Sequence, residues 1–89
     1  MKRSKEDAEV TRQQLLKTAL HIFGEKGFTA TRLEDIAEAA RVTRGAIYHH
    51  FENKKELFVV LFKERIDPFF DIITKKILQF RHMVLFGHH

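Results

Sequence analysis

Apolar residues recur at spacings of three and four along most of the chain, which is the pattern of helices that each bury one face. No alternation of apolar and polar residues continues long enough to indicate a β-strand. The first apolar stripe consists of Leu16, Ala19, Leu20 and Phe23. We expect its helix to begin near Ser4, which forms a capping-box pattern with Asp7, and to end at the glycines Gly24 and Gly27. The pattern therefore predicts an all-α protein.

Three shorter helices are predicted next, each opened by a side chain that can cap a helix N-terminus. The second opens at Thr31, with Glu34 three residues later as its capping-box partner. The third opens at Thr43 and the fourth at Asn53. The inward positions are Leu33, Ile36, Ala37 and Ala40 in the second helix, Ile47 and Phe51 in the third, and Leu57, Phe58, Leu61 and Phe62 in the fourth.

The dipeptide Asp67-Pro68 interrupts this pattern. Proline has no N–H and clashes with the carbonyl four residues earlier, so a helix must kink or restart there. Aspartate as cap and proline as the first helical residue favour a restart. A further helix is expected over residues 69–80, while residues 81–89 show no clear periodicity, and His88 and His89 are interpreted as the start of a tag. These elements predict four helices and part of a following helix.

Composition narrows the class of protein. The 89 residues suffice for one small domain, and the absence of cysteine excludes disulfides and thiolate metal sites and fits a cytoplasmic protein. The longest apolar runs fall far short of the roughly 20 residues of a membrane span, and the N-terminus has no signal-peptide pattern. We therefore expect no membrane association. A net charge of +4 permits an anionic partner without requiring one.

The connection between the second and third predicted helices, residues 40–42, is short enough for a helix-turn-helix unit. In such a unit the second helix enters the major groove of DNA and the first lies across the backbone. The outward side chains of the third helix must then be small or able to donate hydrogen bonds. The candidates are Arg44, Gly45, Ala46, Tyr48, His49 and His50. Gly45 costs about 1 kcal/mol of helix propensity relative to alanine, and its use would be a close approach to another molecule.

The stretch "GFTATRLEDIAEAARVTRGAIYHHFENKKELF" resembles the DNA-binding domain of the TetR family of bacterial transcriptional repressors, and within it the AcrR-like regulators of multidrug efflux. The similarity extends from about Thr11 to Leu61, and the motifs "F..KGF..T", "IA" and "VTRGAIY.HF..K..LF" stand in order. The resemblance implies a DNA-binding domain over residues 1–66. Its expected fold is an all-α three-helix bundle with a homeodomain-like helix-turn-helix, plus helix four and part of a following helix. Residues 67–89 would be a remnant or truncated start of the ligand-binding and dimerisation region.

The resemblance also assigns roles by matched position. Thr43, Arg44, Gly45, Ala46 and His49 fall where the family's residues face DNA bases, and Arg44 is our choice for a bidentate contact to guanine, which contributes about 1–3 kcal/mol of discrimination. The positions that match phosphate contacts are Thr31, Arg32, Tyr48, His50 and Lys54. Lys54 would also benefit from the free N–H groups and the dipole at the start of the fourth helix.

Two departures from the family pattern change what the resemblance implies. Relatives usually carry glycine at the position of Arg41, so Arg41 is expected in a left-handed conformation that costs roughly 1 kcal/mol. The chain is also short for the family, in which two copies bind a palindromic operator as a homodimer and a small-molecule inducer releases them. Pairing is expected only if the full-length chain or the apolar C-terminal helix is present, and inducer binding only in a longer chain.

Several residues of the chain could also indicate a function other than DNA binding. Adjacent histidines on a helix point about 100° apart, so His49 and His50 are poor metal ligands, and no metal or cofactor is expected. Tyr48 could instead be a core aromatic. No catalytic constellation is present, so the chain is not expected to be an enzyme. The remaining alternative is a truncated interaction module that pairs with a full-length regulator through its apolar residues 69–86.

Overall fold

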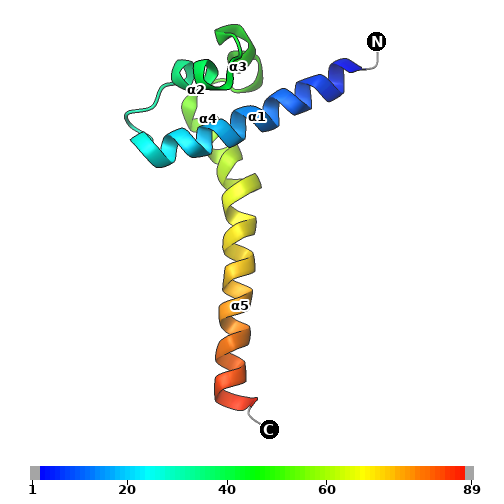
Figure 1. The fold of residues 1–89 in the computed structure, drawn as a ribbon, viewed down its shortest axis with the longest axis vertical. Coiled ribbons are helices and arrows are strands. Elements are labelled where there is room, and N and C mark those ends of the chain that lie inside the picture. Colours follow the sequence, from blue (N-terminus) through cyan, green and yellow to red (C-terminus); the bar gives the residue numbers. More distant parts are fainter. Residues whose placement is uncertain (1–2, 88–89) are drawn as a thin grey trace.

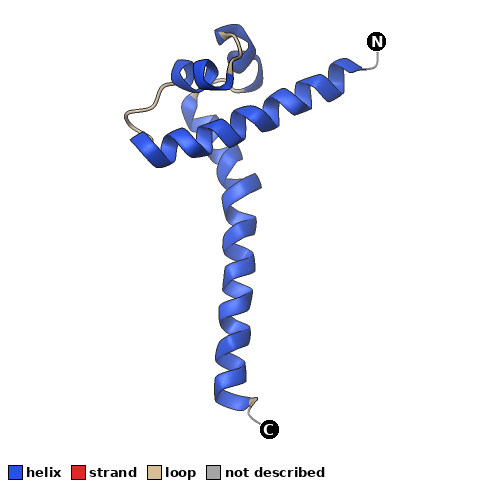
Figure 2. Ribbon diagram, in the orientation of Figure 1, coloured by secondary structure: helices blue, strands red, loops and turns tan. Residues whose placement is uncertain are grey.

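The computed structural model describes residues 3–87 as a series of helices, with no β-strand in that range (Figures 1 and 2). The α-helices are α1 (Arg3–Lys26), α2 (Leu33–Ala40), α3 (Arg44–His50), α4 (Lys54–Leu61) and α5 (Asp67–Phe86), and a π-helical turn, η1 (Phe62–Ile66), joins the last two. Helix α1 packs against α2 and α4, and α2 packs against α3. The predicted all-α class is confirmed. His88 and His89 lie outside the described residues.

The hydrophobic core lies among α1, α2, α3 and α4 and includes most of the predicted inward positions. Both predicted core residues of α3, Ile47 and Phe51, are buried. Two predicted inward residues, Leu20 on α1 and Phe62 after α4, are instead 41% and 42% exposed. The full set of buried apolar residues is Leu15, Leu16, Ala19, Ile22, Leu33, Ile36, Ala37, Ala40, Ile47, Phe51, Leu57 and Leu61.

One predicted helix start was confirmed to within one residue and another was wrong. Helix α1 includes Arg3, next to the predicted start near Ser4, although Ser4 lies within the helix and not at its cap. Helix α2 begins at Leu33, with Arg32 as its N-cap residue, because the Asp35 carboxylate accepts the Arg32 backbone N–H at 3.0 Å. That N–H and the Lys26 ammonium group hold the pKa of Asp35 below its usual range. At the other end of α1, Gly24 lies inside the helix and Gly27, at φ 85°, follows its last residue.

The caps of α3 and α4 were predicted correctly. The Thr43 hydroxyl accepts the Ala46 backbone N–H at 3.0 Å, and the Asn53 side-chain oxygen accepts the Glu56 N–H at 2.8 Å. Each side chain satisfies one of the backbone donors that a helix N-terminus leaves free. These two local contacts fix where α3 starts and where the chain turns into α4.

Arg41 adopts the left-handed conformation that the resemblance implies, with φ 61° and ψ 40°. Its N–H donates to the Glu38 carbonyl at 3.1 Å, and the Val42 N–H donates to the Ala37 carbonyl at 2.9 Å. This is the hydrogen-bond pattern of a helix end that usually carries glycine at the left-handed position. The turn between α2 and α3 is therefore defined by backbone geometry and not by the arginine side chain.

Replacing Arg41 with glycine should raise the free energy of unfolding by about 0.5–1 kcal/mol, because glycine adopts positive φ without the contact of a Cβ with the backbone. Urea denaturation followed by circular dichroism measures the change. The matched control is Arg41→Ala, which removes the same charge but keeps a Cβ. An equal gain in both variants would assign the effect to charge and contradict the strain at this turn.

The expected restart at Asp67-Pro68 was confirmed in part: α5 begins at Asp67 with Pro68 in its first turn, but Asp67 is not its cap. Asp67 has helical dihedral angles of φ −59° and ψ −47°, and its N–H donates to the Phe62 carbonyl five residues earlier. The π-helical turn widens the helix just before Pro68, which moves the carbonyl four residues earlier away from the proline ring. Helix α5 also continues past residue 80 to Phe86. The chain therefore passes from α4 through η1 into α5 without leaving the helical region.

Helix α5 extends from the bundle as a single rod (Figure 1). The described chain measures 59 × 37 × 18 Å, with a radius of gyration of 17.8 Å. A compact domain of this length would have a radius of gyration of about 12 Å. No residue of α5 is buried. The core of the protein therefore ends with Leu61 on α4.

A polar cluster fixes the direction in which this rod leaves the bundle. The Arg12 guanidinium on α1 donates to the Glu64 carboxylate on η1 at 3.2 Å, and the Arg65 guanidinium donates to the Gln13 side-chain oxygen at 2.8 Å. The contact with Arg12 holds the pKa of Glu64 below its usual range. These contacts join segments about fifty residues apart in the sequence.

Candidate nucleic-acid interface

Helix α3 rests on the core by one side and leaves the rest of its surface uncovered. Ile47 and Phe51 anchor it. The exposed residues of its first turn and cap are Thr43, Arg44 and Gly45, and Ala46 is half-buried. A Cβ built at Gly45 would find only the Thr43 hydroxyl, at 4.0 Å. The packing of this chain therefore does not require glycine at position 45.

Three polar side chains from α2 and α3 meet beside this exposed surface. One carboxylate oxygen of Glu34, Oε2, accepts the Tyr48 hydroxyl at 3.1 Å and lies 3.3 Å from Nε of Arg44. The Arg44 guanidinium carbon is 5.7 Å from the centroid of the Tyr48 ring. Hydrogen bonds from the backbone N–H of Glu34 and from the Tyr48 hydroxyl, together with the Arg44 charge, hold the pKa of Glu34 below its usual range. Tyr48 is 42% exposed, so the alternative of a core aromatic was wrong.

The two histidines at the end of α3 have different surroundings. His49 is exposed and His50 is half-buried, and their rings lie 5.4 Å apart at a steep angle. Burial, His49 and the Arg12 charge lower the pKa of His50. Within residues 3–87 no three His, Asp or Glu side chains are grouped closely enough to hold a metal ion.

The predicted role of Thr31 as a phosphate contact was wrong for this structure. Thr31 is fully buried, its hydroxyl donates to the Gly27 carbonyl at 2.7 Å, and its N–H donates to the Phe28 carbonyl. With both donors engaged inside the loop, Thr31 supports the start of α2 and offers nothing to a ligand. Its neighbour Arg32 is different, because its side chain is 76% exposed.

Lys54 opens α4 and packs against the loop that follows α1. Its ammonium group donates to the Phe28 carbonyl at 2.6 Å and lies 4.2 Å from the centroid of the Phe28 ring. Phe28 in turn packs against the rings of Phe23 and Phe58, at 5.6 and 5.4 Å. An ammonium group has three donors, and the Phe28 carbonyl engages one of them. Lys54 is thus held in place with donors left for an anion.

The basic side chains of this region lie at the starts of three helices. Arg32 caps α2, Arg44 is the first residue of α3, and Lys54 is the first residue of α4. A cation at a helix N-terminus is unfavourable by a few tenths of a kcal/mol, because the helix dipole is positive there. Helix α3 has no acidic residue in its first turn to offset this. The positive end of each helix dipole and the basic side chain beside it together favour a bound anion.

Comparison with known proteins identifies the family. A family model for "Bacterial regulatory proteins, tetR family" matches residues 15–61, which is more than half of the 89-residue chain. The chain belongs to this family. The matched residues run from the second half of α1 to the end of α4 and include every residue of the interface described above. Helix α5 lies outside the match.

Curated relatives of the tetR family agree over the same part of the chain. The "Probable acrEF/envCD operon repressor" of Escherichia coli (strain K12) is 58% identical over 57 residues, which cover 64% of this chain and 26% of that protein. The "HTH-type transcriptional regulator TtgR" of Pseudomonas putida is 51% identical over 61 residues, covering 68% of this chain and 29% of that protein. The "Transposon Tn10 TetC protein" of Escherichia coli is 39% identical over 71 residues, covering 80% and 36%. The matched residues thus span only about a quarter to a third of these relatives.

None of the helices in residues 3–87 is both long enough and apolar enough to cross a membrane.

Proposed function

We propose that this chain is the sequence-specific DNA-binding domain of a transcriptional repressor, with α3 placed in the major groove of a palindromic operator. Its base-facing residues are Thr43, Arg44, Gly45, Ala46 and His49, and its phosphate contacts are Arg32, Tyr48, His50 and Lys54. The observation that carries the proposal is the exposed surface of α3, which is anchored by Ile47 and Phe51 and bordered by basic residues at the starts of α2 and α4.

Helix size and chemistry support this placement. An α-helix with its side chains is about 10–12 Å across, which fits a groove roughly 12 Å wide. Gly45 lowers helix propensity without relieving any contact inside the protein, so its benefit would come from close approach of the α3 backbone to DNA. Arg44 can donate to guanine O6 and N7 together. The basic residues Arg32 and Lys54, at the starts of α2 and α4, would contact the phosphate backbone.

The test is a selection of binding sites from a random duplex library, followed by fluorescence anisotropy on the selected duplex and on a scrambled one. A selected consensus with two inverted half-sites would support the proposal, since half-site symmetry reflects a two-fold symmetric dimer. Recovery of sequences with no consensus would contradict it.

We further propose that the protein acts in the cytoplasm and that two copies occupy the operator as a homodimer. We also propose that a small-molecule inducer acts only on a longer chain of this family.

Replacing Lys54 with alanine should weaken binding to every duplex and reduce the slope of log affinity against log salt by about 1, the effect of one lost phosphate contact. Anisotropy titrations at several salt concentrations measure the slope. Lys55→Ala is the matched control, since Lys55 is the exposed neighbour in the same helical turn. A slope that stays the same in Lys54→Ala, or falls equally in Lys55→Ala, would contradict this contact.

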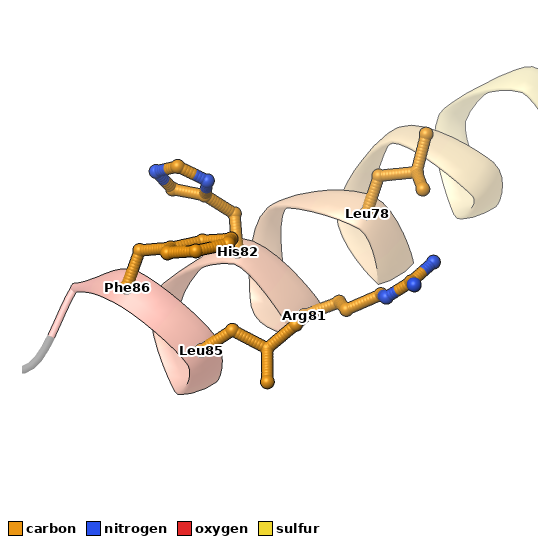
Figure 3. Close-up of a pocket in the computed structure, with 5 residues that line it drawn as sticks. All are labelled: Leu78, Arg81, His82, Leu85 and Phe86. Atoms are coloured by element: carbon orange, nitrogen blue, oxygen red, sulfur yellow. The ribbon is translucent and has the colours of Figure 1, made fainter.

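A second candidate function rests on the surface of α5. Most of its large apolar side chains are more than half exposed, and Figure 3 shows Leu78, Leu85 and Phe86 on this helix with no other element covering them. The exposed apolar residues of α5 are Phe69, Phe70, Ile72, Ile77, Leu78, Phe80, Met83, Val84, Leu85 and Phe86. We propose that residues 69–86 pair with a longer regulator of this family, because apolar surface of this extent is typical of a protein interface.

This pairing predicts concentration-dependent association of the chain itself through the same surface. Light scattering at increasing protein concentration should give a mass above that of a monomer, and Phe80→Glu should restore the monomer by placing a charge on the apolar surface. Gln79→Glu is the control, because it adds the same single negative charge at an exposed polar position of the same helix. A monomer at all concentrations with residues 69–86 intact would remove the basis for this function.

A further inference from the structure

Glu34 is an acidic side chain at the edge of a surface that otherwise suits an anion. It lies in the first turn of α2, and its Oε2 contacts two groups that are four residues apart on α3. Neither contact is buried, since the side chains of Arg44 and Glu34 are 74% and 38% exposed. The contacts therefore add little to folding, because exposed ion pairs typically contribute less than about 1 kcal/mol. A carboxylate at this place would also repel phosphates and weaken binding to every DNA sequence.

The geometry of the ion pair shows what the carboxylate can do. Glu34 meets Arg44 at Nε, which is the inner edge of the guanidinium group, at 3.3 Å. The two terminal nitrogens of a guanidinium group form the fork that donates to guanine O6 and N7. A contact at Nε leaves that fork free and restricts rotation of the guanidinium plane. The Tyr48 ring, 5.7 Å from the guanidinium carbon, flanks the same group.

We propose that Glu34 is a positioning residue for sequence selectivity, which orients the Arg44 fork toward a guanine and disfavours binding to DNA that lacks it. This inference rests on the proposed function, because it requires α3 to enter the major groove. On a duplex without guanine at the contacted position, Arg44 gains no bidentate partner, and the repulsion between Glu34 and phosphate remains. On the operator, the oriented fork loses less rotational freedom when it binds. The repulsion acts on either duplex, so the orientation of the Arg44 fork is the effect that widens the difference between the operator and other DNA.

The experiment compares Glu34→Gln with Glu38→Gln. Glu38 is exposed on the same helix about one turn further on, so both variants remove one negative charge from α2. Affinities are measured by anisotropy for the selected operator, for the operator with the contacted G·C pair exchanged for A·T, and for a scrambled duplex. We expect both variants to bind scrambled DNA more tightly than the parent. Only Glu34→Gln should lose preference for the G·C pair, by about fivefold, the lower end of what one bidentate contact contributes.

A second measurement does not depend on DNA. In the free protein, the Arg44 Nε–H resonance should shift and exchange faster with water in Glu34→Gln, and should stay unchanged in Glu38→Gln. Retention of the full G·C preference in Glu34→Gln, with a parent that does prefer the operator, would overturn the positioning role alone. A parent with no preference for the operator over scrambled DNA would overturn both the proposed function and this inference.

Discussion

Replacing Phe51 with alanine is expected to lower the free energy of unfolding by about 3–5 kcal/mol, the usual loss for a buried phenylalanine. Phe51 is 1% exposed and closes the C-terminus of α3, where its N–H donates to the Ile47 carbonyl at 2.9 Å. The side chain lies in the same core cluster as Leu57 of α4, so its loss would leave a cavity where α3 meets the other helices. Small domains are stable by about 5–15 kcal/mol, so the variant should be largely unfolded near the low end of that range.

Phe69→Ala on α5 provides the matched control, because the chemical change is the same and Phe69 is 58% exposed. Surface substitutions usually change stability by less than about 0.5 kcal/mol. Urea denaturation followed by circular dichroism should therefore separate the two variants clearly, at a protein concentration where the parent is a monomer. Similar losses in both variants would mean that α5 is part of the folded core, contrary to the structure.

Arg44→Ala is expected to weaken operator binding by about 1–3 kcal/mol more than it weakens binding to scrambled DNA. The reason is that alanine removes both the bidentate contact to guanine and the charge, and only the charge matters for a scrambled duplex. Paired anisotropy titrations on the two duplexes measure the difference.

The control for charge alone is Arg41→Ala. Arg41 is exposed, precedes the cap of α3 and lies outside the α3 helix. This variant should weaken binding to the operator and to scrambled DNA by similar factors. If Arg44→Ala behaved in the same way, the base contact would be contradicted, and Arg44 would be only one of several charges near the phosphate backbone.

The parts of the fold that follow from neighbouring residues could be predicted from the sequence. The caps at Thr43 and Asn53 involve residues three positions apart, so their side-chain chemistry was sufficient. Ile47 and Phe51 followed from helical spacing. The left-handed Arg41 followed from the resemblance, since the family usually carries glycine there.

The errors arose where a contact between elements outweighed a local signal. Thr31 has the side chain of a good N-cap, but its hydroxyl is engaged by the Gly27 carbonyl across the loop, and Asp35 completes the cap from within α2. Asp67 has the side chain of a good N-cap before Pro68, but a widened helical turn leads directly into α5, so Asp67 lies within the helix. Sequence spacing alone contains neither of these outcomes.

In the candidate site, too, some features follow from the local sequence and others depend on contacts between helices. The outward residues of α3 could be predicted because a helix-turn-helix pattern implies which helix meets DNA. The contact of Glu34 with Arg44 and Tyr48 could not, because it depends on how α2 crosses α3. From the sequence, Glu34 was predicted only as the capping-box partner of Thr31. The one signal available was the location of Glu34 and Asp35 shortly before a segment that contains Arg41 and Arg44 and no acidic residue.

The central claim is that α3, and not α5, is the surface that meets DNA. The most direct measurement is a titration of the isotope-labelled protein with the selected operator, followed by backbone amide chemical shifts. We expect the largest shifts over residues 43–50 and at Arg32 and Lys54, and little change in residues 69–86. Shifts concentrated in residues 69–86, with residues 43–50 unchanged, would contradict it.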